Sequence, residues 1–442
     1  MNQQSGTVSM KQLWRFFLPL GISASLVTIS HVIINSTLSQ GEHPEQILAS
    51  YAIAMSLLVI TERPALLLRQ TSSVLVRDKR SFRAMLQVSQ LIFFAIMALG
   101  FLICYTPLGN FIFSGLFGLE HSLVPDVIDV YRVLMFVSLF SGIRCLYQGI
   151  IIYNLRTRWL TIGMIVRLIG MYLLSLYFIH SGVKDATVGA YIFLAGMIIE
   201  AAMSYGEGRL LVRRMPDVVP EHEIVKPRQV FSFYRPLLLS TFVAVWIGPV
   251  INAMLGKTTE VALAIASFAL AGSIVQLVVS FFTYFHQIVL NFYKIDREAV
   301  RRFTLLFGFI PALLVSMLAF TPIGEYFVGT IMGVDGKLAI ETLKALKPFV
   351  LLALIMPWLD VFNGIIMVRG HTRVMLGSQI SNLSFTALAL LLLVLVTPGW
   401  NGTIGAWAQS LGLAAECGFV AYAIRRGNRI NRIIAGKVTD ME

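Results

Sequence analysis

Long apolar stretches alternate with short polar connections along the whole chain. The hydrocarbon core of a bilayer is about 30 Å thick, so a helix of ~20 apolar residues crosses it. The apolar stretches are near this length, and the pattern therefore predicts an all-α polytopic membrane protein with twelve transmembrane helices. These are expected near residues 13–38, 47–68, 84–106, 127–152, 159–179, 187–205, 231–255, 261–290, 303–321, 346–368, 374–396 and 403–424.

The longest polar connection lies near the middle of the chain. Residues 209–229 contain three prolines and several charged residues, and proline disfavours a continuing helix. We therefore expect a cytoplasmic linker here. It would join an N-terminal lobe (residues 1–208, helices 1 to 6) to a C-terminal lobe (residues 230–442, helices 7 to 12 and a short cytoplasmic tail).

Composition and charge agree with this arrangement. Of the 442 residues, 57% are hydrophobic and 13% charged, whereas soluble domains have about 25% charged residues. The net charge is +12, but most of the Lys and Arg residues fall on alternate connections. The positive-inside rule then sets both termini in the cytoplasm. The charge thus reflects topology, and we expect a multi-pass protein of the cell (plasma or inner) membrane that does not bind nucleic acid.

Catalytic and metal-binding motifs do not emerge from the sequence. Cys104, Cys145 and Cys417 lie in apolar stretches without paired spacing, so neither a disulfide framework nor a zinc site is indicated. P-loop, HExxH and GxSxG patterns are also missing from the sequence. We expect a protein that is not an enzyme and that has no cofactor or resident metal.

The second half of the chain repeats the first. Pro19 and Asn35 match Pro236 and Asn252 at an offset of 217 residues (236 − 19 and 252 − 35). Thr157-Arg158 matches Thr372-Arg373 at an offset of 215. The near-constant register predicts a duplicated six-helix unit. Because six is even, the two copies share one orientation, and we expect two lobes, related by an axis along the membrane normal, that enclose a cavity.

Several short motifs resemble a known family. The residues concerned are Leu13-Trp14-Arg15-Phe16-Phe17-Leu18-Pro19-Leu20-Gly21-Ile22, Leu48-Ala49-Ser50-Tyr51, Pro64, Lys79-Arg80 and Met332-Gly333-Val334-Asp335. In order and spacing they look like the progressive ankylosis (ANK) family, which is similar to the MATE exporters of the multidrug/oligosaccharidyl-lipid/polysaccharide (MOP) flippase superfamily. The resemblance implies a 6+6, MATE-like secondary transporter that alternates between inward-open and outward-open forms.

This resemblance and the buried charges lead to one expected function. The chain is expected to be a monomer among membrane lipids and to export a small organic or phosphate-bearing anion, with coupling to H+ or Na+. Two alternatives stay open, a flippase for lipid or lipid-linked oligosaccharide and a MATE-like cation-coupled drug exporter.

Candidate substrate ligands are polar residues inside the predicted spans. Ionisable groups are costly in the bilayer and usually face a partner or a water-filled cavity. Arg144 and Arg167 offer donors suited to carboxylate or phosphate, or they pair with Glu200 or Glu416 to hold helices together. The neutral candidates for the cavity wall are Asn35, Asn252, Gln148 and Asn363.

Four residues are candidates for a coupling ion or proton. Glu200 and Glu416 occupy matching positions in the repeat and carry either a coupling proton or a shared structural role. Asp360 has no acidic counterpart in the first half and is either an ion site or a partner of Arg144. His31 titrates near neutral pH when unperturbed, or it is a hydrogen-bonded packing group.

The second predicted span contains a charged pair before a proline. Glu62 and Arg63 precede Pro64, which favours a kink. The two charges either neutralise each other near the interface or form an intracellular gate.

Overall fold

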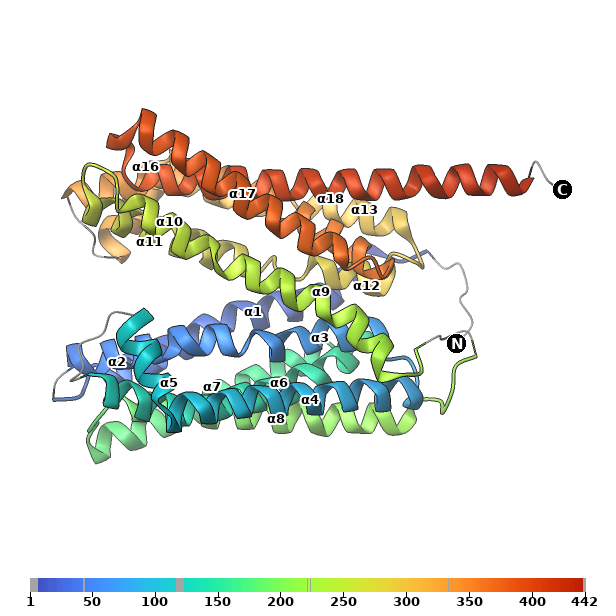
Figure 1. Ribbon diagram of the computed structural model, residues 1–442, viewed down its shortest axis with the longest axis horizontal. Coiled ribbons are helices and arrows are strands. Elements are labelled where there is room, and N and C mark those ends of the chain that lie inside the picture. Colours follow the sequence, from blue (N-terminus) through green and yellow to red (C-terminus); the bar gives the residue numbers. More distant parts are fainter. Residues whose placement is uncertain are drawn as a thin grey trace. The chain divides into compact units, whose positions relative to one another are not determined.

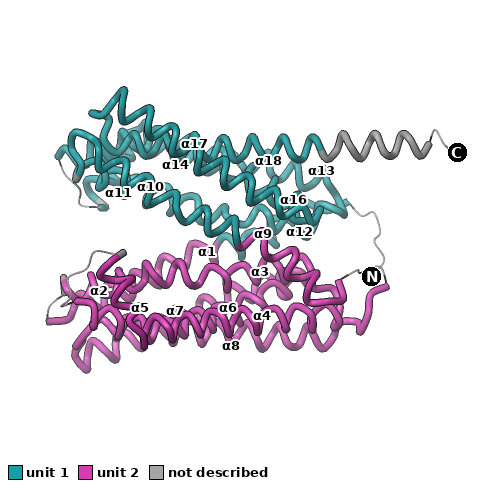
Figure 2. Tube along the Cα trace, in the orientation of Figure 1, with its two compact units in different colours: residues 1–21, 239–442 teal, residues 22–238 magenta. Residues whose placement is uncertain are grey.

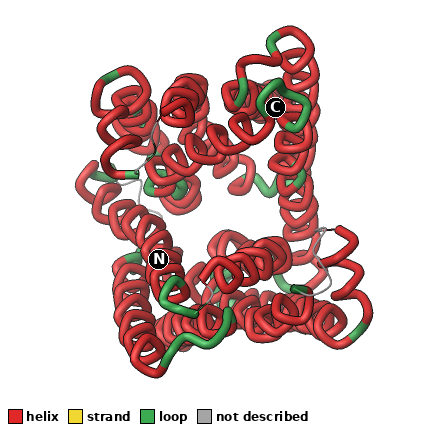
Figure 3. Tube along the Cα trace, turned by 90° about the vertical axis from the view of Figure 1, so that its left-hand side faces the viewer, coloured by secondary structure: helices red, strands yellow, loops and turns green. Residues whose placement is uncertain are grey.

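The computed structural model describes residues 7–42, 44–116, 123–220, 222, 224–332, 334 and 336–439, with the side chains of the last helix up to residue 426. Every regular element in this part of the chain is helical, and no strand occurs in it (Figures 1 and 3). The predicted all-α class is confirmed.

The helices of the first half end at Arg214. Their bounds are α1 (Met10–Leu38), α2 (Pro44–Thr61), α3 (Arg63–Leu75), α4 (Lys79–Tyr105), α5 (Pro107–Asn110), the π-helical turn η1 (Phe111–Leu116), α6 (Val124–Tyr153), α7 (Arg158–Ser181) and α8 (Thr187–Arg214).

The second half begins with α9. Its helices are α9 (Pro227–Val245), α10 (Ile247–Leu255), α11 (Val261–Ser280), α12 (Phe285–Phe292), α13 (Arg297–Phe307), α14 (Ile310–Phe320), α15 (Pro322–Tyr326), the π-helical turn η2 (Phe327–Ile331), α16 (Gly336–Val368), α17 (Arg373–Val396), the short η3 (Pro398–Trp400) and α18 (Gly402–Thr439).

Eleven of the twelve predicted spans have the length and apolar character to cross a bilayer. Ten helical spans in the described residues meet this standard, and the pair α2 and α3, bent by 40°, makes an eleventh. The twelfth lies in α18, which is more polar because it carries residues such as Gln409 and Glu416.

Prolines explain three breaks that the pattern of apolar residues does not reveal. Pro64, Pro249 and Pro311 fall in the first turns of α3, α10 and α14. Proline fits the first turn of a helix but clashes with the turn before it. Each of these spans is therefore built from two helices.

The helix faces that do not pack inside the protein are strongly apolar. On α7, large aliphatic side chains are exposed every three or four residues, for example Ile162, Ile165, Ile169 and Leu173. On α17 the same holds for Leu388, Leu391, Leu392 and Leu395. Exposed apolar surface of this extent marks contact with a partner or a membrane, and together with the many apolar spans it indicates a multi-pass membrane protein.

The chain forms two compact units (Figure 2). Unit 2 is Ile22–Leu238, and unit 1 comprises Met1–Gly21 and Leu239–Glu442. The unit boundaries fall inside α1 and α9, at positions related by the repeat offset of 217 (238 − 21). The first helix of each repeat therefore begins in one unit and ends in the other. The division at residues 209–229 that the sequence suggests does not include this change of unit within a helix.

The parts of α1 and α9 that precede these boundaries, residues 10–21 and 227–238, make equivalent contacts within their units. In unit 1, Phe17 of α1 packs against Phe281, with ring centroids 5.7 Å apart. In unit 2, Tyr234 of α9 donates a hydrogen bond to the carbonyl oxygen of Pro64 over 2.8 Å. Both residues of the second pair lie 217 positions from those of the first (234 − 17 and 281 − 64), so the exchange follows the duplication.

Two aspartates anchor the segments that precede α1 and α9. In unit 1 the amide of Val8 donates to Asp296 over 3.0 Å, and in unit 2 the amide of Val219 donates to Asp78 over 2.8 Å. Asp78 also caps α4 through Ser81. The described part of the 209–229 connection is thus fastened to unit 2.

Equivalent helices form the interior of each unit. In unit 2, α6 packs against α8, α3 and α2, and α7 packs against α8. In unit 1, α16 packs against α18, α12 and α11, and α17 packs against α18. The trios α6, α7, α8 and α16, α17, α18 are repeat partners, and they carry the buried polar residues described below.

Candidate functional site

A buried carboxylate joins three helices of unit 2. Glu200 on α8 accepts hydrogen bonds at Oε2 from Nη1 of Arg144 on α6, over 3.0 Å, and from Nη1 of Arg167 on α7, over 2.9 Å. Gln148 on α6 donates to its Oε1 over 3.0 Å. All four residues are at most 8% exposed. Both predicted arginines therefore pair with Glu200, which is one of the two readings that the sequence left open.

The helices around Glu200 carry residues that let them pack closely against one another. Arg144 and Gln148 are four residues apart, so they share one face of α6. A Cβ atom on Gly196 of α8 would lie 2.5 Å from the sulfur of Met171 and 3.2 Å from Cγ of Arg167. Glycine at position 196 thus lets α7 reach α8 one turn from Glu200.

The guanidinium groups of Arg144 and Arg167 have more N–H donors than there are good acceptors around them. Arg144 Nε is buried and has no hydrogen-bond partner among the described residues. Arg167 Nε reaches only the sulfur of Met171, over 3.5 Å, and its guanidinium lies over the ring of Phe193 at 5.3 Å. Sulfur is a weak acceptor, so both arginines keep donor capacity that Glu200 does not use.

The network extends towards the break between α2 and α3. Arg69 on α3 donates to Oε1 of Gln148 over 3.3 Å. Glu62 directly precedes α3, and Arg63 is the first residue of that helix. The predicted gate pair therefore lies at the observed 40° bend. With Arg63 next to Glu62, the region contains four arginines (Arg63, Arg69, Arg144 and Arg167) and two carboxylates (Glu62 and Glu200).

Unit 1 holds a second buried carboxylate at the repeat position. Glu416 on α18 is 2% exposed. Its Oε2 accepts from Nδ2 of Asn382 over 2.7 Å, and its Oε1 accepts from Nε2 of Gln379 and from Oγ of Ser378, the latter over 3.5 Å. All three donors lie on α17 and are uncharged.

The two carboxylates are related by the repeat, but their partners differ in chemistry. The offset of 215 pairs Asn382 with Arg167 (382 − 167), Gln379 with Met164 and Leu359 with Arg144. Unit 2 thus has two cations where unit 1 has an amide and an apolar side chain. Asn382, Gln379 and Ser378 were missed as site residues, although the offset applied to Arg167 points to Asn382.

Asp360 of α16 binds a histidine of α12. Its Oδ2 accepts from the backbone amide of His286 over 2.8 Å, and its Oδ1 lies 2.9 Å from Nδ1 of the same residue. Nε2 of His286 in turn lies 3.0 Å from Nε2 of Gln287. His286 is 4% exposed. Asn363, one turn after Asp360, has a buried Oδ1 without a hydrogen-bond partner in the described residues.

The predicted polar positions of the first helix of each repeat differ in their surroundings, and His31 lies beside Phe193, the ring over which the Arg167 guanidinium lies. Asn35 and Asn252 have exposed side chains. His31 is partly buried, with its ring 5.7 Å from the ring of Phe193. The roles assigned to these three residues stay predictions.

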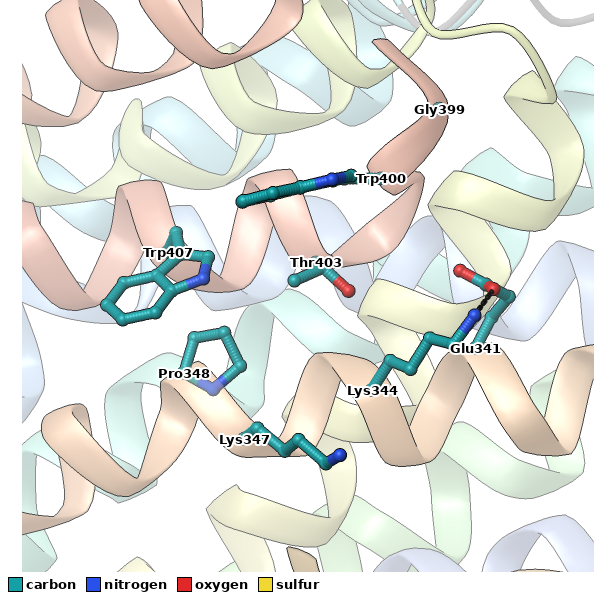
Figure 4. A pocket seen from close by; sticks show the side chains of 8 residues that line it. All are labelled: Glu341, Lys344, Lys347, Pro348, Gly399, Trp400, Thr403 and Trp407. Atoms are coloured by element: carbon teal, nitrogen blue, oxygen red, sulfur yellow. Dashed lines mark hydrogen bonds and ion pairs between the residues drawn. The ribbon is translucent and has the colours of Figure 1, made fainter. Parts of the chain in front are cut away.

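A pocket of ≈ 420 Å³ opens in unit 1, and none of its lining residues belongs to the buried clusters. Figure 4 shows the rings of Trp400 and Trp407 on its walls, with Lys344 paired to Glu341 over 2.8 Å. Lys347 lies over the ring of Phe320, at 5.8 Å from its centroid. The lining residues are Glu341, Lys344, Lys347, Pro348, Gly399, Trp400, Thr403 and Trp407. Among the described residues, no group of three or more His, Cys, Asp or Glu side chains is arranged to hold a metal ion.

Comparison with known proteins gives a family match for the first part of the chain and a fold for nearly all of it. The family model of the progressive ankylosis protein (ANKH) matches residues 1–167. No curated protein matches the chain.

Solved transporter structures resemble nearly the whole chain. A MOP superfamily transporter from Pyrococcus furiosus is 17% identical, with 94% of this chain and 95% of that chain covered and a TM-score of 0.74. An outward-facing multidrug resistance MATE transporter is 18% identical over 94% and 95% of the two chains, with a TM-score of 0.72. The eukaryotic MATE transporter AtDTX14 is 13% identical over 93% and 95%, with a TM-score of 0.75.

These similarities agree with the duplicated helices and the paired units. The resemblance to the progressive ankylosis family is confirmed for residues 1–167, and the chain as a whole has the 6+6 helical fold of the MATE transporters in the MOP superfamily.

Proposed function

We propose that the chain is a secondary active transporter that exports an organic or phosphate-bearing anion across the cell membrane by alternating access. One observation carries this proposal: Arg144 and Arg167 share the single carboxylate of Glu200 in a buried position.

The charge balance around Glu200 favours an anionic ligand. An arginine stays charged in proteins and its planar fork matches carboxylate and phosphate. Including Arg63, Arg69 and Glu62, the region has two cations more than it has anions. An anion that bound here would offset this excess and accept hydrogen bonds from donors that are now poorly used, such as Arg144 Nε.

The comparisons support transport more strongly than they support a substrate. The matched neighbours are transporters by their names, and one of them is described as having a binding pocket of reverse polarity that suggests a different function. The similar fold therefore does not by itself identify the substrate of this chain. We expect a monomer without enzymatic activity.

Efflux from proteoliposomes tests the proposal. Purified protein would be reconstituted with labelled pyrophosphate, citrate or ATP inside, and efflux would be followed with and without a pH or Na+ gradient. We expect gradient-dependent efflux of at least one of these anions and no efflux of a cationic dye.

The variants must separate ligand binding from folding. Removing both arginines alone would leave Glu200 buried and unpaired, which is strongly destabilising. We therefore choose Arg144→Met, Arg167→Met and Glu200→Gln together, which removes all three charges, and compare it with Arg144→Lys plus Arg167→Lys, which keeps them. The neutral variant is expected to lose efflux at least about tenfold, which is ~1.4 kcal/mol, while it remains folded. Full efflux by the folded neutral variant would refute the anion site.

A lipid or lipid-linked-oligosaccharide flippase is the second candidate, and the pocket of unit 1 favours it. Tryptophan and lysine side chains suit an amphipathic ligand with an anionic headgroup at a membrane interface, and here Trp400, Trp407 and Lys347 line one pocket (Figure 4). Flipping of a fluorescent anionic phospholipid in the same vesicles, lost in Trp407→Ala, would favour this candidate over anion export.

A further inference from the structure

Glu416 is a buried carboxylate whose partners in the described residues are all uncharged. Its hydrogen bonds come from Asn382, Gln379 and Ser378. A buried carboxylate is costly unless a cation or a proton compensates it. The repeat partner Glu200 has two permanent cations for this purpose.

The charged groups of the neighbouring helices do not compensate Glu416. The helices that pack against α18 are α10, α11, α16 and α17. The first two contain no Asp, Glu, Lys, Arg or His. On α16, Asp360 is bound to His286 and Glu341 to Lys344. No cation of the described residues forms an ion pair with Glu416. Among the described side chains of these helices, the remaining titratable groups are Lys337 and Lys347 on α16, Arg373 at the start of α17, and Cys417, Tyr422, Arg425 and Arg426 on α18 itself.

The amide partners can serve both protonation states of Glu416. An amide offers NH₂ donors to a carboxylate, and after rotation it offers its oxygen to a protonated carboxyl group. Arginine has no acceptor, so Arg144 and Arg167, unlike the amide of Gln148, can serve Glu200 only in its ionised form. The hydroxyl of Thr386 is 3.1 Å from Oδ1 of Asn382. Because a hydroxyl both donates and accepts, it can keep a hydrogen bond to Asn382 after the amide rotates. The corresponding residue in unit 2 is Met171 (386 − 171 = 215), which cannot donate.

We propose that Glu416 with Asn382, Gln379 and Ser378 is a reversible proton-binding site of unit 1, and that Glu200 is its permanently ionised counterpart in unit 2. In the step, a proton passes from a hydronium ion to one oxygen of the Glu416 carboxylate. The O–H bond of the hydronium ion breaks as the carboxyl O–H bond forms, a water molecule is left, and the group becomes neutral. The use of this proton to drive export rests on the proposed transport function, but the binding itself does not.

Infrared difference spectroscopy of the purified full-length protein tests the site without a substrate. Spectra at acid and alkaline pH would be compared for the wild type, Glu416→Gln and the matched control Glu200→Gln, in K+ and again in Na+ at the same pH values. We expect a carbonyl band of a protonated carboxylic acid that appears at the lower pH, is lost in Glu416→Gln and persists in Glu200→Gln.

A pair of substitutions at one position tests the role of the partners. Asn382→Arg introduces the cation that unit 2 has at this place, and it is expected to keep Glu416 ionised and to remove the band. Asn382→Leu is similar in size but brings no charge, and it is expected to retain the band. Thermal denaturation identifies any variant that fails to fold. If Asn382→Arg does not fold, the presence of the band in Asn382→Leu still tests the site.

The outcomes separate this proposal from transport itself. A band that does not depend on Glu416, a band that disappears equally in both Asn382 variants, or a carboxylate that responds to Na+ at constant pH would each overturn the proton site. Loss of efflux with the band intact would instead refute the proposed function and leave the proton site standing.

Discussion

Asn382 donates to Glu416 over 2.7 Å from the same place in the repeat at which Arg167 donates to Glu200 over 2.9 Å. The two contacts have similar lengths, but the donor is neutral in unit 1 and positively charged in unit 2. One copy of the duplicated unit therefore encloses an ion network with an excess of cations, whereas the other encloses a carboxylate among neutral donors.

Transferring the unit 1 residue into unit 2 should destabilise the protein. Arg167→Asn leaves the buried Glu200 with only one of its two cations, and breaking a buried pair costs up to about 3–5 kcal/mol. We expect a clearly lower free energy of unfolding in detergent, measured by chemical denaturation. Asn382→Ala removes a neutral donor and should cost less, about 1–3 kcal/mol. Equal losses in the two variants would argue against a difference in charge compensation.

A glycine of α18 should be intolerant of a methyl group. A Cβ atom on Gly412 would lie 1.9 Å from Oγ1 of Thr386 and 2.5 Å from Oδ1 of Asn382. Gly412→Ala must therefore displace the polar residues of α17, at a cost of about 1–3 kcal/mol. Gly418, on the same helix, has nothing within 4 Å of its Cβ position, and Gly418→Ala should be neutral or slightly stabilising. Thermal denaturation of the two variants tests this contrast.

The contact between Asp78 and the central connection should be lost only in acid. Burial raises the pKa of Asp78, but hydrogen bonds from the amide and hydroxyl of Ser81 and the amide of Val219 outweigh it, so the pKa lies below its usual value. A lowered pKa in the folded state means that the stabilisation is complete above the unfolded value, about 3.9, and is lost as the pH falls through the folded value.

Hydrogen exchange of the Val219 amide measures this contact. Protection should be constant from neutral pH down to about pH 5 and should decrease in stronger acid, whereas Asp78→Asn should lower it at every pH. Asp296→Asn is the matched variant in unit 1 and should affect Val8 instead, because Asp296 accepts from that amide. Exchange at Val219 that changes in Asp296→Asn but not in Asp78→Asn would contradict the assignment.

The start of α12 should depend on Asp360. Asp360→Asn removes the carboxylate that accepts from both the backbone amide and the ring of His286. The expected cost is about 1–3 kcal/mol, together with faster hydrogen exchange at residues 285–288. Asp360→Glu keeps the charge and should be intermediate. Unchanged exchange at His286 in Asp360→Asn would show that the carboxylate does not hold this helix.

Much of the fold could be predicted because membrane spans follow from local composition. Each apolar stretch must satisfy its backbone groups internally, and in a bilayer a helix is the simplest way to do so. The constant offsets between matched residues such as Pro19 and Pro236 then revealed the duplication. The breaks were harder to predict, since Pro64, Pro249 and Pro311 lie in the first turn of a new helix, while Pro19, Pro236 and Pro357 lie inside a continuous helix.

The candidate site could be predicted only in part. Arg144, Arg167, Glu200 and Glu416 stand out because charge inside a span is rare. Neutral residues such as Asn382 and Gln379 do not stand out, because polar amides are common and their effect depends on what they face. His286 and Asp360 are 74 positions apart, and no local pattern joins them.

The sequence by itself determined the helical class, the repeat and the small set of charged residues inside the spans, because each depends on residue type and spacing along the chain. Only the tertiary structure decided that both arginines bind Glu200, that Glu416 has neutral partners and that the first helix of each repeat extends from one unit into the other. Partner choice depends on side-chain directions and helix packing over distances of 33 to 56 residues in the chain, and these are fixed only when the helices come together.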